Sequence, residues 1–335
     1  MIAGMSSLNG VRRPPGFISL AAVFILSGCA TTLDLDGALT VVPYRLERDG
    51  RIVVEAAVNG AGPFEFILDS AASISAVFDG LRNRLSLEVI PGQVVKIRGA
   101  VASGEFSLVD IESLTLGTET WVRPRVVSLP SDTEVARDLD GVLGVDFLGR
   151  YAVFFSAGDR VIGLYPPELV AQQNYRGWSS IPLSIRSIAK GGPAVYFIDI
   201  EIDGHEVSAV FDLGAGVNMI NWKGARSLGI KRSRMGSNQV IIGAIDAMKV
   251  LARLDAREVT TAGVRWRNES FAIADLEIFE TLMIADEPTA ILGATLFTQR
   301  DFIIDFQRNR LLVNVGQKEL DHTVTAPPRE RKQRL

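Results

Sequence analysis

Two aspartates, Asp69 and Asp212, occupy matching positions in this chain. In the segment 64–73 (FEFILDSAAS), Asp69 follows an apolar run directly. In the segment 207–216 (VSAVFDLGAG), Asp212 does the same. An aspartate that comes directly after a buried run and before small residues marks a tight turn. Two such turns suggest two carboxylates that meet across a pseudo-twofold axis. Carboxylates held that close share one proton and can act as a general acid and a general base.

The matching turns belong to a longer internal repeat. Gly99 lies 30 residues after Asp69 (99 − 69 = 30), and Gly243 lies 31 residues after Asp212 (243 − 212 = 31). Further along, a Leu-Gly segment occurs in each copy and is followed by an apolar strand and a turn: 141–148 (GVLGVDFL) and 290–297 (AILGATLF). Four landmarks in one order at nearly constant spacing predict two copies of one folding unit.

The pattern between these landmarks is typical of strands. Short β-branched runs recur with turn residues every 8–12 positions, which predicts an all-β fold of closed barrels or sandwiches. Asn59-Gly60 and Asp203-Gly204 favour tight hairpins whose second strands lead into the two aspartates. Helices are expected to be few and short, near Asp79–Leu85 and Trp222–Leu228.

The repeat sets the expected domain boundaries. Ser131–Asp140 and Asp275–Glu287 are interpreted as longer surface loops. We expect a signal peptide, a tether, a first unit, a linker, a second unit and a disordered tail, with the boundaries 1–28, 29–40, 41–165, 166–180, 181–316 and 317–335.

Composition excludes several kinds of chemistry. The 335 residues carry a net charge of −4, which argues against nucleic acid as the main partner. With Cys29 as the only cysteine, no intramolecular disulfide can form, and with His205 and His322 as the only histidines a Cys/His zinc cluster has no ligand set. A Ser-His-Asp triad would need a rigidly held histidine. His205 follows a turn and His322 lies near the carboxyl end, so neither fits that role.

The amino end has the features of an export signal. Arg12 and Arg13 precede the apolar stretch Phe17–Leu26, which is too short to span a bilayer. The stretch ends in Leu26-Ser27-Gly28-Cys29, which resembles the lipobox of bacterial lipoproteins. That resemblance implies cleavage before Cys29, lipid attachment to its thiol and a periplasm-facing place in the cell envelope. With Ala30 next, it implies the outer membrane in a Gram-negative host.

The two aspartate turns resemble the Asp-Thr/Ser-Gly-Ala-Ser turn of retropepsin-like aspartic proteases. Leu143-Gly144 and Leu292-Gly293 resemble the apolar-apolar-Gly element that supports that turn in the family. The glycines Gly99 and Gly243 fall where the family places its flap hairpins. The resemblance covers about residues 45–165 and 185–315, and it implies two tandem retropepsin/pepsin-like β-barrel units related by a pseudo-twofold axis.

The resemblance also implies a reaction. Asp69 and Asp212 would activate a water molecule for attack on a peptide bond, with no metal or cofactor. The hydroxyl after the aspartate braces the opposite loop in the family; Ser70 can do this and Leu213 cannot. Gly214 keeps the usual glycine of the turn, whereas Ala71 adds a methyl group that would crowd it.

The fourth position after each aspartate differs as well. In the family this residue hydrogen-bonds the catalytic carboxylate; Ser73 keeps the oxygen, and Gly216 lacks it. Two functions therefore stay open: an aspartic endopeptidase acting on extracytoplasmic proteins, or a lipoprotein that binds peptides without cleaving them. The site itself could form within one chain, as an intramolecular pseudo-dimer, or between the first units of two chains.

Overall fold

The computed structural model describes residues 37–98, 103–131, 138–172, 175–187, 194–231, 239–242, 247–250 and 252–316. The expected signal peptide, Cys29, Gly99, Gly243 and the expected tail lie outside these residues. Within the described ranges, no helix combines the length and the apolar character needed to cross a bilayer.

The first unit is built almost entirely of strands. The helices described in it are short, α1 (Asp79–Arg84) and α2 (Val145–Leu148), and a further short helix, α3 (Pro167–Gln172), follows its last strand. Its strands are β1 (Thr40–Leu46), β2 (Ile52–Val58), β3 (Ala61–Leu68), β4 (Ala76–Phe78), β5 (Val89–Arg98), β6 (Ser103–Asp110), β7 (Ser113–Leu116), β8 (Glu119–Val122), β9 (Arg125–Leu129), β10 (Gly141–Leu143), β11 (Ala152–Ser156) and β12 (Val161–Tyr165).

The second unit repeats this plan. It contains α4 (Trp222–Ser227), α5 (Glu277–Thr281), α6 (Ala294–Phe297) and a 3-10 turn, Phe306–Arg308. Its strands are β13 (Trp178–Pro182), β14 (Ser184–Ser187), β15 (Ala194–Ile202), β16 (His205–Phe211), β17 (Asn218–Ile220), β18 (Gln239–Ile242), β19 (Ala247–Val250), β20 (Arg253–Thr261), β21 (Val264–Ile273), β22 (Thr289–Leu292), β23 (Phe302–Asp305) and β24 (Arg310–Asn314). The all-β prediction with few short helices is confirmed.

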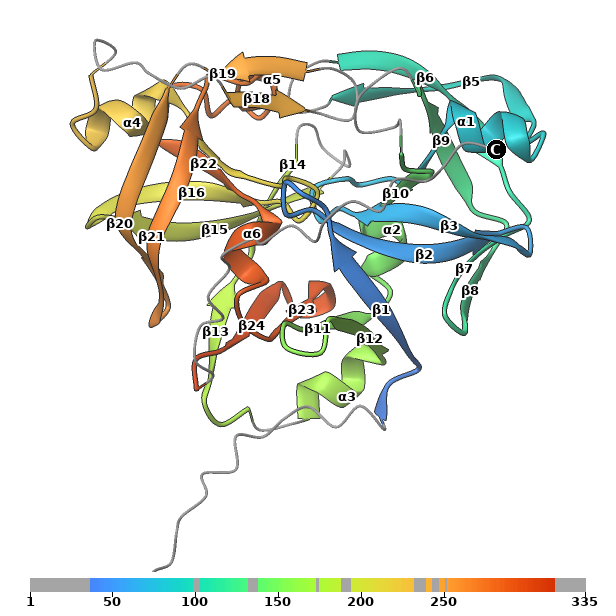
Figure 1. Ribbon diagram of the computed structural model, residues 1–335, viewed down its shortest axis with the longest axis horizontal. Coiled ribbons are helices and arrows are strands. Elements are labelled where there is room, and N and C mark those ends of the chain that lie inside the picture. The colour runs from blue at the N-terminus through green and yellow to red at the C-terminus, as the bar shows by residue number, and fades with distance from the viewer. Residues whose placement is uncertain are drawn as a thin grey trace, which may run out of the picture.

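Each unit places its aspartate by the same strand arrangement. In the first unit, β3 pairs in parallel with β10, and β10 pairs antiparallel with β4. In the second, β16 pairs in parallel with β22, which pairs antiparallel with β17. Because the strand before each aspartate lies between its hairpin partner and a later strand, the turn that follows is held on both sides. Figure 1 shows the two units side by side, β3 on the right and β16 on the left.

The hairpins that precede the aspartates form as predicted. Asn59 and Gly60 have φ of 53° and 73°, and Asp203 and Gly204 have φ of 48° and 82°. Positive φ at both central residues gives a turn whose twist matches that of the flanking strands. The dipeptides thus close the hairpins whose second strands, β3 and β16, end at the two aspartates.

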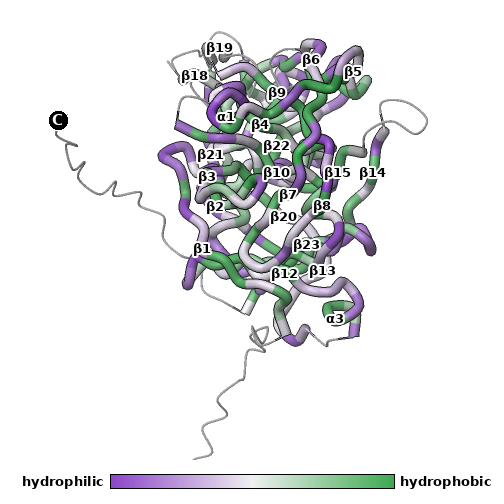
Figure 2. The backbone as a smooth tube through the Cα atoms, turned by 90° about the vertical axis from the view of Figure 1, so that its right-hand side faces the viewer, coloured by the Kyte–Doolittle hydropathy of each residue, from purple (hydrophilic) through white to green (hydrophobic). Residues whose placement is uncertain are grey.

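A third sheet segment, at the bottom of Figure 1, joins the two units. Its strands run in the order β13-β24-β23-β11-β12-β1, so three strands of the second unit lie beside three strands of the first. At the seam, β11 pairs antiparallel with β23, and Phe155 stacks on Phe302 with ring centroids 4.3 Å apart. One hydrophobic core containing both rings extends through both units, and Figure 2 shows apolar stretches running through the stacked strands.

Two segments that are expected to be connections contain short helices. The expected linker holds α3 and the start of β13, which pairs with β24. The prediction of a surface loop at Asp275–Glu287 holds only in part: Met283 and residues 285–287 are exposed, but the rest is not a surface loop. This segment contains α5, and Leu276, Phe279 and Ile284 are buried. Its apolar residues are spaced as on one face of a single helical turn, a pattern too short to stand out in the sequence.

The shared core predicts that the two units unfold together. Phe302 is fully buried, so the Phe302→Ala variant should lose about 3–5 kcal/mol of unfolding free energy. Denaturant unfolding followed by fluorescence and by circular dichroism should show one coincident transition, shifted to lower denaturant. Val122→Ala, at a position that is 67% exposed, serves as the control and should shift it little. Two separated transitions in the parent protein would contradict a common core.

Candidate active site

Each aspartate lies immediately after the strand that carries it, and its main chain is tied to the supporting strand. The Asp69 N–H donates to the Leu143 carbonyl at 3.0 Å, and the Asp212 N–H donates to the Leu292 carbonyl at 3.1 Å. These bonds continue the parallel pairings of β3 with β10 and of β16 with β22. The two Leu-Gly segments found in the sequence are therefore the elements that locate the aspartates.

The carboxylates are fixed by their own turns. Asp69 Oδ1 accepts hydrogen bonds from the N–H groups of Ala71 and Ala72, both at 2.8 Å. Asp212 Oδ1 accepts from Gly214 and Ala215, at 2.9 and 3.1 Å. An aspartate that caps its own turn in this way has little rotational freedom. The remaining oxygen of each group is thereby directed away from its own turn.

The two carboxyl groups meet each other, one from each unit. Their side chains are hydrogen-bonded partners, and both residues are only partly exposed. Gly214 makes this approach possible, because a Cβ at that position would lie 2.4 Å from Cγ of Asp69. The two turns identified in the sequence thus come together within one chain.

Burial and mutual repulsion disturb both ionisations. Burial raises the pKa of Asp69, although the N–H groups of Ala71 and Ala72 oppose that shift. Burial also raises the pKa of Asp212, and the neighbouring charge of Asp69 raises it further, to well above its ordinary value. Two carboxyl groups in contact repel each other when both are ionised. The pair therefore holds one proton over an intermediate pH range.

Ser70 bridges the two turns. Its hydroxyl donates to the Phe211 carbonyl at 2.9 Å and accepts from the Leu213 N–H at 2.9 Å. Ser70 is fully buried, so these partners replace water. Leu213 occupies the equivalent position in the second turn and is fully buried in the common core. The hydroxyl bridge between the turns is thus made from one side.

Two other positions differ from the expected turn geometry. Ser73 is exposed, and among the described residues the hydrogen bonds to the Asp69 carboxylate come from Ala71, Ala72 and Asp212. The methyl group of Ala71 was expected to crowd its turn. Instead, Ala71 packs against an apolar cluster of the second unit that includes Phe279 and Leu282.

A second set of polar residues, which the sequence reasoning missed, holds the supporting glycines. In the first unit, the Gly144 N–H donates to Ser75 Oγ, and Ser75 Oγ donates to Asp146 at 2.6 Å. In the second unit, the Gly293 N–H donates to Asn218 Oδ1 at 2.9 Å. Ser75 and Asn218 each lie six residues after the aspartate (75 − 69 = 6; 218 − 212 = 6). This equal spacing was the signal in the sequence that could have identified them.

Asn218 is in turn held by a buried carboxylate. Its Nδ2 lies 3.3 Å from Glu269 Oε2, and Gln299 donates to the other oxygen of Glu269 at 2.9 Å. In the first unit, burial raises the pKa of Asp146, although the hydroxyl and N–H of Ser75 oppose that shift. The two supports thus have the same position in each unit but different chemistry.

Hairpins stand at the expected flap positions. β5 pairs with β6 and β18 pairs with β19, so the expected flap glycines lie in the connections between these strands, outside the described residues. Both hairpins lie at the same end of the molecule, at the top of Figures 1 and 2. Ser103, at the start of β6, donates to Glu277 of α5. The hairpin of the first unit therefore reaches the second unit.

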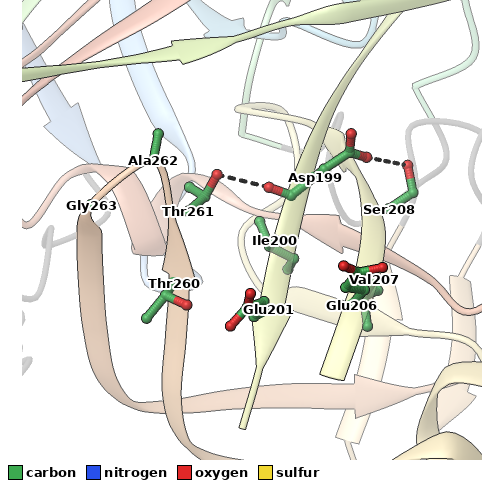
Figure 3. A pocket seen from close by; sticks show the side chains of 10 residues that line it. All are labelled: Asp199, Ile200, Glu201, Glu206, Val207, Ser208, Thr260, Thr261, Ala262 and Gly263. Atoms are coloured by element: carbon green, nitrogen blue, oxygen red, sulfur yellow. Dashed lines mark hydrogen bonds between the residues drawn. The ribbon is translucent and has the colours of Figure 1, made fainter. Parts of the chain in front are cut away.

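A separate hollow of about 630 Å³ lies in the second unit, away from the aspartates (Figure 3). It is at the turn end of the β15–β16 hairpin, whereas Asp212 follows the other end of β16. Asp199, Glu201 and Glu206 line it, and all three are exposed. The described residues include no group of three or more His, Cys, Asp or Glu side chains that could hold a metal ion.

Comparison with solved structures finds a distant likeness. The crystal structure of conglutin gamma, described as a unique basic 7S globulin from lupine seeds, aligns over 82% of this chain and 94% of its own, with 13% identity and a TM-score of 0.47. A search of curated protein sequences finds no match.

The family comparison concerns the duplicated units themselves. A family model described as aspartyl protease matches the chain twice, at residues 54–147 and 198–296. Each match contains one aspartate turn and its Leu-Gly support, and the two together cover more than half of the chain. The chain therefore belongs to the aspartyl protease family, with two tandem copies of the family's domain.

Proposed function

We propose that this protein is an aspartic endopeptidase that hydrolyses peptide bonds of extracytoplasmic proteins. The observation that carries the proposal is the direct contact of the Asp69 and Asp212 carboxyl groups, each fixed by two main-chain N–H groups. Membership of the aspartyl protease family supports it.

The one proton that the pair shares provides both an acid and a base. When Asp69 is the ionised member, it accepts a proton from a bound water molecule, and the water oxygen attacks the peptide carbonyl carbon. Asp212, which holds the shared proton in that state, donates it to the carbonyl oxygen. The tetrahedral species then collapses: the C–N bond breaks, and the nitrogen leaves as an amine after taking the proton held by Asp69. One of the two hydroxyl groups of the tetrahedral species gives its proton to Asp212, and the dyad recovers its starting state.

The two hairpins provide the surface that covers the substrate. Closure of such hairpins excludes water and strengthens electrostatic contacts to the reacting carbonyl. The contact of Ser103 with Glu277 supports a role for β5–β6 in this closure, because it spans the two units beside the hairpin tip.

The place of action is proposed from the amino end. The export signal and the lipobox-like Leu26–Cys29 support a protein held at the cell envelope by lipid on Cys29. Attached acyl chains contribute about 0.8 kcal/mol per buried methylene, so two or more of them make a stable anchor. A peptide or protein in the periplasm is the substrate that fits this position.

A second function is favoured by one observation. Because Leu213 has no hydroxyl, the bridge between the turns is made from Ser70 alone. A dyad held from one side could bind peptides without cleaving them, since misplacement by about 1 Å can lower a rate about 10²-fold. Replacing Asp69 or Asp212 by asparagine separates the two functions.

Replacing either aspartate should abolish hydrolysis. In Asp69→Asn and Asp212→Asn, cleavage of unstructured peptides should fall by at least about 10²-fold between roughly pH 3 and 8, because the acid–base pair is lost. Asp199→Asn, in the exposed hollow, is the matched control and should keep the parent rate. The measurement is kcat/KM by mass spectrometry of the products. A parent protein that binds peptides but shows the rate of its two dyad variants would establish the second function.

The dyad should also reduce stability at neutral pH. Both carboxyls have raised pKa values, so the folded state binds more protons than the unfolded state above about pH 4, and stability falls as the pH rises through the folded-state values. Asp212→Asn should therefore raise Tm at pH 7 and have little effect near pH 3.5. If Asp212→Asn changed Tm by the same amount at both pH values, the raised pKa values of the dyad would be contradicted. Asp199→Asn again provides the control.

Loss of the Ser70 bridge should lower kcat by more than the accompanying loss of folded protein can explain. Ser70→Ala leaves a buried carbonyl and a buried N–H without their partner, at a cost of about 1–3 kcal/mol, and frees the Asp212 turn. We expect kcat to fall at least about tenfold with KM little changed. Ser227→Ala, which removes a hydroxyl bonded to a main-chain carbonyl within α4, should leave kcat unchanged. Equal effects of the two variants on kcat would refute the bridging role.

A further inference from the structure

The tip of the β1–β2 hairpin, Glu47–Arg51 in the first unit, packs against the catalytic turn of the second unit. A Cβ on Gly216 would lie 2.4 Å from the Asp49 carbonyl oxygen and 2.8 Å from Asp49 Cγ. From the other side of this contact, a Cβ on Gly50 would lie 3.2 Å from the Gly216 oxygen and 2.1 Å from Cγ2 of Thr295. Two glycines, one on each surface, thus permit a main-chain contact that any side chain would prevent.

The hairpin tip is held firmly by its own bonds. The Gly50 N–H donates to the Glu47 carbonyl at 2.9 Å, and the Glu47 N–H donates to the Arg51 carbonyl at 2.8 Å. Arg51 binds the Asp49 carboxylate through Nε at 2.7 Å and through its own N–H at 3.2 Å. The Arg51 side chain is only 12% exposed. A carboxylate fixed by two groups of one residue is a stiff support for the turn beside it.

The tip contacts the part of the second turn that Ser70 does not reach. Ser70 holds Phe211 and Leu213, on either side of Asp212, while the hairpin tip presses on Gly216, four residues after it. Thr295, which the tip also touches, lies in α6 next to Ala294, whose N–H donates to the Ala215 carbonyl at 2.9 Å. The second turn is therefore enclosed by the first unit at both of its ends.

We propose that the Asp49-Gly50 tip is a positioning element of the active site, which holds the Asp212 turn against Asp69. This inference rests on the proposed function. Its two contact positions, Gly50 and Gly216, are positioning residues, since they act on the carboxyl of Asp212 only through the turn.

A consequence concerns the family's hydroxyl at position 216. Gly216→Ser gives the second turn the serine that the first turn has at Ser73. The space for that side chain, however, is filled by the main chain of Asp49. The serine must displace the hairpin tip, so this change should lower activity.

The test compares two glycines with positive φ. One of them contacts the second unit, and the other faces open space. Gly50 has φ of 92° and Gly204 has φ of 82°, but a Cβ on Gly204 would meet nothing within 4 Å. Gly50→Ala and Gly204→Ala thus share the strain of a left-handed residue, and only the first disturbs the dyad. Gly216→Ser is the partner variant on the other surface.

The readouts are the pH profile of kcat/KM with an unstructured peptide and the carboxyl titration of Asp69 and Asp212, followed by NMR of protein labelled at the aspartate Cγ. Gly50→Ala and Gly216→Ser should lower kcat about tenfold or more with KM nearly unchanged. They should also narrow the gap between the two apparent pKa values, because carboxyls that move apart interact less. Gly204→Ala should keep the kcat and the gap of the parent.

The inference is overturned if the two contact variants keep the parent gap and rate, or change them no more than Gly204→Ala does. If circular dichroism shows that both contact variants fail to fold, Asp49→Ala decides the matter, because it removes atoms from the contact and should narrow the gap in the same direction. An inactive parent protein would refute the proposed function, whereas the NMR titration would still show whether the tip sets the spacing of the dyad.

Discussion

The active site depends on keeping two half-buried carboxyl groups in contact. Asp69 and Asp212 repel each other when ionised and lose hydration when buried, so neither would stay in place without the main chain that surrounds it. Each carboxyl is capped by its own turn, each turn is tied to a Leu-Gly strand, and each strand is fixed by a hairpin. The fold supplies that arrangement twice, and the common core holds the two copies together.

The two copies solve the same problem by different contacts. The first turn contributes a hydroxyl, Ser70, and the second contributes a glycine, Gly214, which allows the turns to touch. Behind the turns, a serine with an aspartate supports one glycine, and an asparagine with a glutamate supports the other. Features that look like losses in one copy are thus matched by features of the other, and the site is complete only when both copies are considered.

The sequence was informative wherever a structural demand is local. Dipeptides such as Asn59-Gly60 predict their hairpins because positive φ is a property of the residues themselves, and the repeat located both aspartates and their supports. Contacts between the units left no such signal. Nothing near Ala71 shows that its methyl group packs on the second unit, and nothing near Gly216 shows that Asp49 lies against it. These positions are decided by tertiary packing, which single-chain patterns do not encode.

The pairing of β11 with β23 also shows what each unit would expose on its own. Each unit presents one of these strands as an edge, with an aromatic ring beside it, and an open apolar edge readily pairs with another strand. A single unit separated from its neighbour would therefore carry the means to associate with an identical copy, in the same antiparallel sense. Because both edges belong to one chain, this pairing forms within the molecule at any protein concentration and leaves neither edge open to a second copy.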